Sequence, residues 1–344
     1  MAIAPALIAP EPRRSAGSAD YGRRRQTGTG GHVSDGPRRY RNFIMDSRRW
    51  DGFEFRDDDI VISTPSKCGT TWMQMQCALL VFKTPDLPGK LTRLSPWLDV
   101  QTETVESVFA ELASQEHRRF IKTHTPFDGI PYDPRVTYIT VGRDPRDVAL
   151  SWDNHMANIK FDVVLGLRAE AVGLDDLAEV MPNGLPIPQE DPVARFWDWM
   201  ESETLSDEDV SGLVGLLHHL DTFWQHRDDD NVAMFHYADM KADLAGSMRR
   251  LASVLKVDVD DATMAQLVAA AGFEEMRGRA AELAPQVTSD FWADSNRFFN
   301  KGASEQWRSF FTDDDVARYE ARVRALAAPA LSEWVHRGSI GALK

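Results

Sequence analysis

The sequence is poor in cysteine and lacks any long apolar run. Its two cysteines, Cys68 and Cys77, do not stand in a histidine cluster, so neither a disulfide framework nor a zinc site is predicted. No segment approaches the ~18 uninterrupted apolar residues of a membrane span. The apolar first ten residues are broken by prolines and lack preceding cations, which makes them a poor secretory signal. These absences favour a cytoplasmic protein without a membrane span.

Basic residues are outnumbered by acids, 39 against 53, and the formal net charge of -14 disfavours nucleic-acid binding. The first 50 residues depart from this pattern, with ten Arg, no Lys and four acids. We interpret residues 1–42 as a flexible Arg/Gly-rich tail, because they show no apolar periodicity. An arm that contacts an anionic partner is the alternative. Residues 43–344 are predicted to form one domain, since no repeat or interdomain linker is visible.

Strand-like and helix-like segments alternate after the tail. This alternation predicts an α/β fold with a central parallel sheet flanked by helices. Prolines gather within residues 158–222, where the pattern loosens, and we interpret this stretch as a lid or insertion beside a binding site. The predicted strands lie near residues 59–63, 119–122, 136–141 and 232–236, and the predicted helices cover 70–82, a segment from 144 onward, 239–256, 260–272 and 313–336.

The first strand runs into a turn with the chemistry of an anion site. Residues 66–72 read Ser-Lys-Cys-Gly-Thr-Thr-Trp, and the predicted helix begins directly after the glycine. Gly69 lets the backbone approach an anion, and Lys67 supplies a mobile charge. Thr70, Thr71 and the unpaired first amides of the helix supply donors. A metal-dependent P-loop needs Lys directly before Ser or Thr, so this order favours a phosphate or sulfate bound without metal. An ordinary capped turn is the alternative.

Two further segments offer contacts to an anion. Arg143 leaves the third predicted strand, and Ser151 follows it by eight residues, two turns into the next helix. Both side chains could reach one phosphate along one helix face. Near the C terminus, Lys301 and Gly302 follow Asn300 and offer a charge and free amides. Taken alone, each segment is equally compatible with a salt-bridged helix start or a surface turn.

A histidine follows the second predicted strand in Lys122-Thr123-His124. Open α/β sheets bind ligands at the carboxyl ends of their strands. An imidazole with a pKa of ~6.5 also suits proton removal near neutrality. A lone histidine is more often structural, so the neighbouring motifs decide, and they make His124 a candidate general base.

Together these segments resemble the cytosolic sulfotransferase family. Residues 67–72 resemble its 5′-phosphosulfate loop, normally Lys-Ser-Gly-Thr-Thr-Trp, and Lys122-Thr123-His124 matches its Lys-Thr-His segment. The spacing from Arg143 to Ser151 matches its 3′-phosphate segment. Residues 237–241, 273–276 and 301–312 resemble three more family segments. The six segments stand in the family's order and cover about residues 50–335.

The resemblance implies a P-loop-like sulfotransferase architecture and a role for each matched residue. The donor would be 3′-phosphoadenosine 5′-phosphosulfate (PAPS), with PAP as the product and no metal. His124 would deprotonate the acceptor hydroxyl, while Lys67 and Lys122 would stabilise charge on the bridging oxygen. The implied donor-binding residues are Lys67, Cys68, Gly69, Thr70, Thr71, Trp72, Arg143, Ser151, Tyr237, Phe273, Asn300, Lys301 and Gly302.

The sequence also departs from the family pattern. Cys68 replaces the usual loop serine and removes one hydroxyl donor. Asn300 stands where the family usually has arginine, which should weaken the grip on the 3′-phosphate. The family's C-terminal dimerisation motif is not visible, so no oligomeric state is predicted.

The acceptor is predicted only as a small molecule with a hydroxyl group. Trp97, Phe127 and Trp152 stand beside the matched segments and are predicted to line its pocket, with residues 158–222 as an acceptor-side lid. Aromatic walls favour an alcohol or phenol over a sugar. Two other functions stay open: a metal-dependent P-loop small-molecule kinase and a non-catalytic PAPS- or PAP-binding protein. The sequence is also compatible with sulfation that leads to dehydration of the acceptor.

Overall fold

A four-stranded parallel sheet forms the centre of the protein. The computed structural model describes residues 36–181, 184, 190–202, 212–283, 291–294, 297–298, 305–309 and 311–338. Neighbouring strands are parallel throughout, so their carboxyl ends meet at one edge of the sheet. The strands, in the order β2-β1-β3-β4, are β1 (Ile60–Ser63), β2 (Phe120–Thr123), β3 (Thr137–Gly142) and β4 (Val232–His236).

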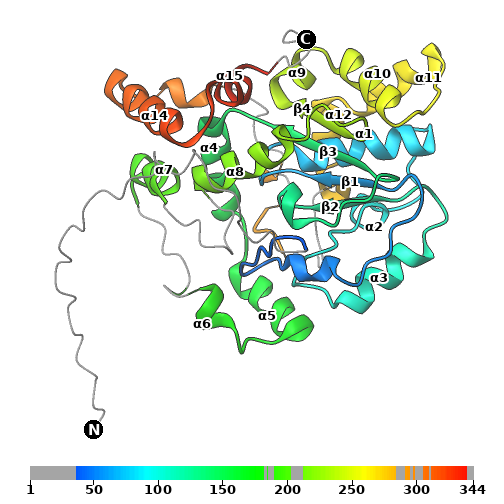
Figure 1. Ribbon diagram of the computed structural model, residues 1–344, viewed down its shortest axis with the longest axis horizontal. Helices are drawn as coiled ribbons and strands as arrows, with labels where there is room; N and C mark the ends of the chain where they lie inside the picture. Colours follow the sequence, from blue (N-terminus) through cyan, green and yellow to red (C-terminus); the bar gives the residue numbers. More distant parts are fainter. Residues whose placement is uncertain are drawn as a thin grey trace, which may run out of the picture. The chain divides into compact units, whose positions relative to one another are not determined.

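Helices connect and cover the strands (Figure 1). The first half of the described chain contains α1 (Thr70–Phe82), α2 (Leu91–Leu94), α3 (Val105–Ser114), α4 (Pro145–Met156), α5 (Phe161–Val172), α6 (Leu177–Val180) and α7 (Pro192–Glu201). The second half contains α8 (Gly212–Trp224), α9 (Tyr237–Ala242), α10 (Leu244–Val254), α11 (Asp261–Ala270), α12 (Phe273–Gly278), α13 (Ala280–Leu283), α14 (Asp313–Leu326) and α15 (Pro329–Arg337). Short 3-10 helices are η1 (Ser47–Trp50), η2 (Phe127–Gly129) and η4 (Gln306–Ser309).

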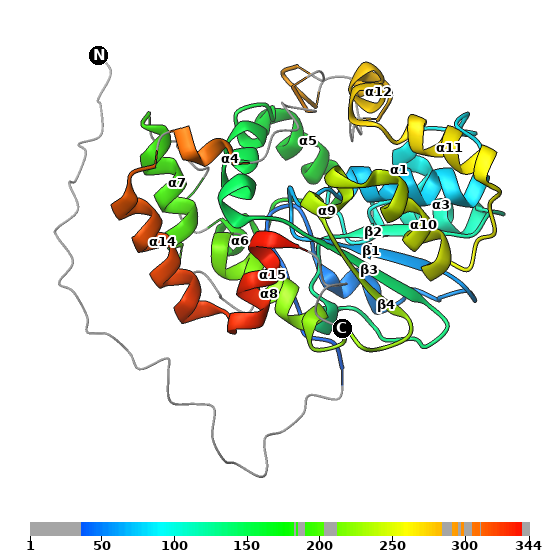
Figure 2. The same ribbon diagram turned by 90° about the horizontal axis from the view of Figure 1, so that it is seen from above.

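Alternation along the strands divides the core into two layers. Ile60 and Ile62 face the layer formed with α1, α2, α10 and α11, whereas Val61 faces the layer formed with α3, α8 and α15. Figure 2 shows α8 and α15 on the side of the sheet away from α1 and α11. All four strands are almost entirely buried, as expected for a parallel sheet covered on both faces.

The predicted α/β fold is confirmed, with four differences in detail. The compact unit begins at Gly36, and Tyr40 within the predicted tail is fully buried. Helices α5 to α7 and most of α8 lie within residues 158–222, and α8 belongs to the core. The predicted helix over 239–256 is interrupted at Asp243, which separates α9 from α10. The predicted helix over 313–336 is two helices, because Pro329 begins α15 in a position where a continuing helix would lack a backbone donor.

Candidate active site

The turn between β1 and α1 brings backbone amides together. Lys67 has a φ of 66° and Gly69 a φ of 110°, two left-handed residues within three positions. Left-handed turns of this kind form concave sites lined by N–H groups. A Cβ on Gly69 would also lie 3.1 Å from the ring of Tyr237, so a side chain would be crowded there as well as strained by the positive φ. The turn ends at the N terminus of a 13-residue helix, which favours a bound anion.

The other side chains of the turn differ in burial and in hydrogen bonding. Cys68 is fully buried, and burial raises the pKa of its thiol to about 12, which disfavours a reactive thiolate. Thr70 Oγ1 lies 2.6 Å from Thr64 Oγ1, so one of its hydrogen bonds is made inside the turn. Thr71 is half-buried in the first turn of α1.

Aromatic side chains gather beside the turn. The indole nitrogen of Trp72 donates a hydrogen bond to the carbonyl oxygen of Ala271 at 2.9 Å, which ties α1 to the end of α11. The rings of Trp72 and Tyr237 are 5.3 Å apart. Phe273 begins α12 two residues after Ala271 and is half-buried. The structure therefore brings the predicted donor-binding residues Trp72 and Tyr237 together, and Phe273 lies two residues after the carbonyl group that Trp72 contacts.

Arg143 links the turn to this aromatic group. Its guanidinium lies 4.3 Å from the centre of the Tyr237 ring and donates to the carbonyl oxygen of Lys67 at 3.0 Å. Its Nε atom is buried without a hydrogen-bond partner among the described residues. A buried charged donor without a partner is costly. Arg143 therefore has unused donor capacity at the edge of the turn.

Helix α4 carries further polar residues toward the same place. Asp147 and Ser151 follow Arg143 at four-residue steps, which places them on roughly one face. The Asp147 carboxylate accepts the backbone N–H of Glu305 at 3.0 Å. The predicted contacts Asn300, Lys301 and Gly302 lie outside the described residues.

His124 is held in one tautomer. Its Nδ1 atom lies 2.7 Å from the carbonyl oxygen of Thr64. A carbonyl only accepts, so Nδ1 carries the proton and Nε2 keeps its lone pair. Burial, followed by the charge of Lys122, lowers the pKa of His124 well below its usual value. The imidazole is therefore neutral near neutral pH and has a free basic nitrogen.

Two lysines and a second histidine surround His124. Lys67 Nζ lies 3.4 Å from Nδ1 of His155, at the end of α4, so neutral His155 accepts from the ammonium group. Burial, with the charges of Arg143 and Lys122, lowers the pKa of Lys67 to about 7. Burial lowers the pKa of Lys122 to about 8. This group of neighbouring cations would stabilise negative charge.

An aromatic and apolar wall borders these cations. The ring of Trp97 lies 4.9 Å from the ring of His124 and 4.0 Å from Lys122 Nζ. His155 lies 5.7 Å from the ring of Trp152 and 5.2 Å from that of Trp292. Trp292 also belongs to a small apolar cluster that is separate from the two layers of the core. Its buried members are Val164, Phe291 and Trp292, and its partly buried members are Phe43, Ile44, Ile159, Leu167 and Phe298.

The structure does not place Phe127 in this wall. Its ring packs against Phe223, Tyr138 and His226 at 4.6 to 5.1 Å, in the core and beside a separate surface groove. These contacts give no support to Phe127 as an acceptor contact, and that role stays a prediction. Its position after the Lys-Thr-His segment suggested the pocket, but the turn of η2 directs it toward α8.

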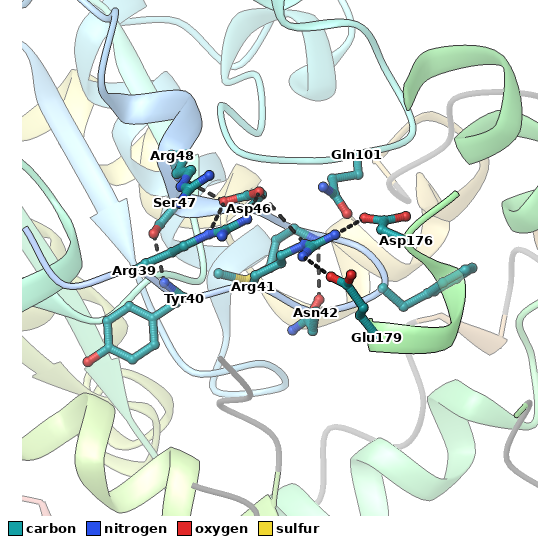
Figure 3. A network of polar contacts seen from close by, with 12 residues as sticks. Arg39, Tyr40, Arg41, Asn42, Asp46, Ser47, Arg48, Gln101, Asp176 and Glu179 are labelled. Carbon is teal, nitrogen blue, oxygen red and sulfur yellow. Dashed lines mark hydrogen bonds and ion pairs between the residues drawn. The ribbon is translucent and has the colours of Figure 1, made fainter. Parts of the chain in front are cut away.

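A polar network joins the segment 39–48 to residues near α6 (Figure 3). Arg41 lies between Asp46 and the acidic residues of α6, pairing with Asp176 and with Glu179, the latter at 3.0 Å. The fully buried Arg168 of α5 also donates to Asp176 at 2.7 Å. Helices α5 and α6, within the predicted lid, are thus tied to the segment that precedes β1.

Sequence reasoning missed His155, Trp292 and Asp99. His155 extends the four-residue series of Arg143, Asp147 and Ser151, so helical spacing could have identified it. Trp292 reaches the site because residues 291–294 pair with 158–160, with a bridge between Ile159 and Trp292. No motif in the sequence predicts this long-range pairing.

Fold and site together define a group-transfer enzyme that binds an anionic nucleotide at the carboxyl edge of a parallel sheet. The chain belongs to the sulfotransferase family, whose Sulfotransferase domain matches residues 57–335. The family uses PAPS as its sulfuryl donor. The kinase and non-catalytic alternatives are set aside by this membership. Among the described residues, no helix has the length and apolar character needed to cross a membrane.

Two kinds of relatives place the chain within the family. A glycolipid sulfotransferase of Mycobacterium bovis is 43% identical over 310 residues, covering 88% of this chain and 95% of the relative. A glycolipid sulfotransferase of Mycobacterium tuberculosis is 42% identical over 311 residues, with the same coverage. The fold resembles a mouse sulfotransferase complexed with PAP (TM-score 0.59, 22% identity, 83% of this chain and 90% of the other). It also resembles retinol dehydratase with androsterone and PAP (TM-score 0.58, 20% identity, 80% and 82%).

Proposed function

We propose that this sulfotransferase transfers the sulfuryl group of PAPS to a sugar hydroxyl of a glycolipid, with His124 as the general base. The observation that carries the base assignment is the 2.7 Å contact between Nδ1 of His124 and the carbonyl oxygen of Thr64, which leaves Nε2 free to accept a proton. The glycolipid is supported by the two mycobacterial relatives above 40% identity. They favour a sugar over the alcohol or phenol expected from the aromatic residues alone.

The residues of the donor side fit an adenosine bisphosphate carrying a sulfate. Gly69, Thr71 and the first amides of α1 would hold the 5′-phosphosulfate, and the unpartnered Nε of Arg143 would meet the 3′-phosphate together with Ser151. Trp72, Tyr237 and Phe273 would hold the adenine. We expect Lys301 and Gly302 to contact the 3′-phosphate as well, and Asn300 to bind it more weakly than the usual arginine would. Neither lysine nor these amides requires a metal partner to bind an anion.

PAPS supplies an activated sulfuryl group whose leaving group is the phosphate of PAP. His124 Nε2 would take the proton of the acceptor hydroxyl as its oxygen attacks sulfur. Lys67, which contacts His155 in this structure, would neutralise charge on the departing phosphate, and Lys122 would add a second positive charge. In this scheme the protein mainly positions the reactants and stabilises charge.

The acceptor wall has two parts that suit the two parts of a glycolipid. Trp152, His155 and Trp292 offer ring surfaces beside Lys67, where a sugar ring could lie. The apolar cluster around Val164 and Phe291 begins at Trp292 and would accept the lipid portion. An apolar wall next to a cationic centre binds a molecule that is polar at one end only.

The test is transfer of labelled sulfate from PAPS to three matched acceptors: a monoglycosyl lipid, its free sugar and its sugar-free lipid alcohol. We expect the glycolipid to give the highest kcat/KM and a product heavier by one sulfuryl group, also in excess chelator. Transfer to the lipid alcohol alone would overturn the sugar assignment. A product lighter than the acceptor by one water would show that sulfation leads to elimination. The absence of transfer to all three would overturn the acceptor class.

A further inference from the structure

Asp99 is a fully buried carboxylate next to the reacting centre that has no part in the chemistry above. It lies in the segment after α2, which runs beside β2. Trp97 forms a parallel bridge with Lys122, and the backbone N–H of Leu98 donates to the carbonyl oxygen of Lys122 at 3.1 Å. This pairing places Asp99 beside the residues that follow Lys122.

The carboxylate binds the residues on both sides of His124. Its Oδ2 atom accepts the hydroxyl of Thr123 at 2.5 Å and the hydroxyl of Thr125 at 2.6 Å. Thr123 is the last residue of β2 and Thr125 follows it by two positions, so the carboxylate binds the residues on both sides of the imidazole.

The same carboxylate also orients the aromatic neighbour of the base. Its Oδ1 atom accepts the indole N–H of Trp97 at 2.5 Å, and Oδ2 accepts that of Trp50 at 3.1 Å. The Trp97 ring contacts both His124 and Lys122. One side chain thus sets the positions of the base, of its aromatic neighbour and, through that neighbour, of a catalytic lysine.

The hydrogen bonds around Asp99 favour its carboxylate form. Indole N–H groups only donate, and the Thr123 hydroxyl accepts the backbone N–H of Thr125 at 2.9 Å, which leaves its own proton available for Asp99. Burial raises the pKa of Asp99, and the bonds from Thr123, Thr125 and the two tryptophans oppose that rise. The carboxylate form is thus surrounded by four hydrogen-bond donors.

We propose that Asp99 is a positioning residue for sulfuryl transfer, which fixes His124 and Trp97 and maintains the positive charge of Lys122. This inference rests on the proposed role of His124 as the base. Charged and titratable groups face the pair from several elements: Lys67 from the phosphate turn, His124 from the end of β2, His155 from α4 and Arg49 from η1. Asp99 is the acid whose attraction raises the pKa of Lys122 against burial.

The central test is Asp99→Asn, assayed for transfer and for PAP binding. We expect kcat to fall at least tenfold while the Kd for PAP, measured at a pH below the pKa values of Lys67 and Lys122, stays within twofold of wild type. The alkaline limb of the kcat/KM profile should move to lower pH, because Lys122 loses the charge that favours its protonated form. A merely structural role would not move that limb.

Thr123→Val and Thr125→Val separate positioning from charge. Thr125→Val removes one hydrogen bond to Asp99, and Thr123→Val removes one to Asp99 and one from the backbone N–H of Thr125. Both keep the carboxylate, so kcat should fall about threefold to tenfold with the alkaline limb unchanged. They also keep the inference testable if Asp99→Asn fails to fold. Asp59→Asn is the matched control, a buried carboxylate paired with Arg119 before β1, remote from the site. Asp59→Asn should reduce the amount of folded enzyme, which is determined by titration with PAP. The pH profile of the folded enzyme should be unchanged.

The outcomes distinguish this inference from the proposed function. Wild-type kcat and an unmoved alkaline limb in Asp99→Asn would overturn the role of Asp99 and leave sulfuryl transfer intact. A loss of kcat matched by an equal loss of PAP binding would also overturn it, because the defect would then be structural. Wild-type enzyme without transfer to any acceptor would instead contradict the proposed function itself.

Discussion

A single backbone carbonyl determines which nitrogen of His124 is basic. The carbonyl oxygen of Thr64 belongs to the residue after β1, whereas His124 follows β2, so two neighbouring strand ends are needed to set the tautomer. The pKa of His124 is lowered by burial and by Lys122, which keeps the base unprotonated near neutral pH. At the scale of single residues, catalysis therefore depends on where the strands end.

His124→Ala should lower kcat by about 10²- to 10⁴-fold and leave the Kd for PAP nearly unchanged, since general-base catalysis is lost and the donor contacts remain. Transfer is measured with labelled PAPS, and PAP binding by calorimetry. His226→Ala is the control, because His226 is partly exposed and pairs with Asp229 far from the sheet edge that carries the site. Unchanged kcat in His124→Ala, or a large loss of PAP affinity, would show that His124 is not the base.

The two lysines should couple donor binding to pH. Their pKa values of about 7 and about 8 are lowered, so both are partly neutral in the free enzyme at pH 7.5 to 9. A bound anion favours the ammonium forms and raises these pKa values, so PAP binding should take up protons. The affinity for PAP should therefore fall as pH rises through this window. Calorimetry in buffers of different ionisation heat measures the uptake.

Lys67→Met provides the control for this linkage. It should bind PAP more weakly and lose part of the proton uptake, while the part due to Lys122 remains. Equal heats in all buffers for the wild type, corrected for the phosphates of PAP, would contradict the proposed contact of these lysines with the donor.

At the scale of elements, α4 connects the two halves of the site. Its four-residue series runs from Arg143, just before the helix, through Asp147 and Ser151 to His155 beside Lys67. The sequence predicted the first and third members because they match a known segment, and helical geometry places the others near the same face. Asp147 also holds the segment that follows Lys301 and Gly302.

Asp147→Ala should weaken PAP binding about tenfold, because the backbone N–H of Glu305 loses its partner. The 3-10 helix η4, which follows Glu305, then loses its attachment to α4. The control is Asp153→Ala on the same helix, whose carboxylate pairs with Arg195 at 2.6 Å. PAP affinity is measured by calorimetry for both. Equal affinity in Asp147→Ala and wild type would show that residues 305–309 do not support the donor site.

Elements with strong local signals were predictable, and those that depend on distant pairing were not. The β-branched runs of β1 to β4 and the capped start of α4 at Asp144 and Pro145 can be read from the sequence, because propensity and capping act locally. The position of Phe127 could not, since its direction is decided by packing against α8. Asp99 gave no signal, because its partners come from β2 and η1.

At the scale of the whole molecule, the site residues and a stabilising buried ion pair lie at opposite edges of the parallel sheet. Its carboxyl edge gathers the phosphate turn, His124 and Arg143. At the opposite edge, Arg119 pairs with the buried Asp59 and donates to the carbonyl oxygen of Glu54 at 3.0 Å. Breaking a buried pair by removing one partner typically costs about 3–5 kcal/mol. The two edges should therefore respond to different mutations.

Ligand binding should couple the carboxyl edge to the stability of the whole domain. PAP at 100 times its Kd stabilises the folded state by about 2.7 kcal/mol, which should raise Tm by several degrees in differential scanning calorimetry. His124→Ala should keep this shift, because the donor contacts remain. Arg143→Ala should lose most of it at the same PAP concentration, because the guanidinium beside Tyr237 and the phosphate turn is removed. Each shift is taken from the variant's own PAP-free Tm, so a lower starting stability does not affect the comparison. A full shift in Arg143→Ala would contradict its contact with the 3′-phosphate, whereas a lost shift in His124→Ala would place that histidine among the donor contacts.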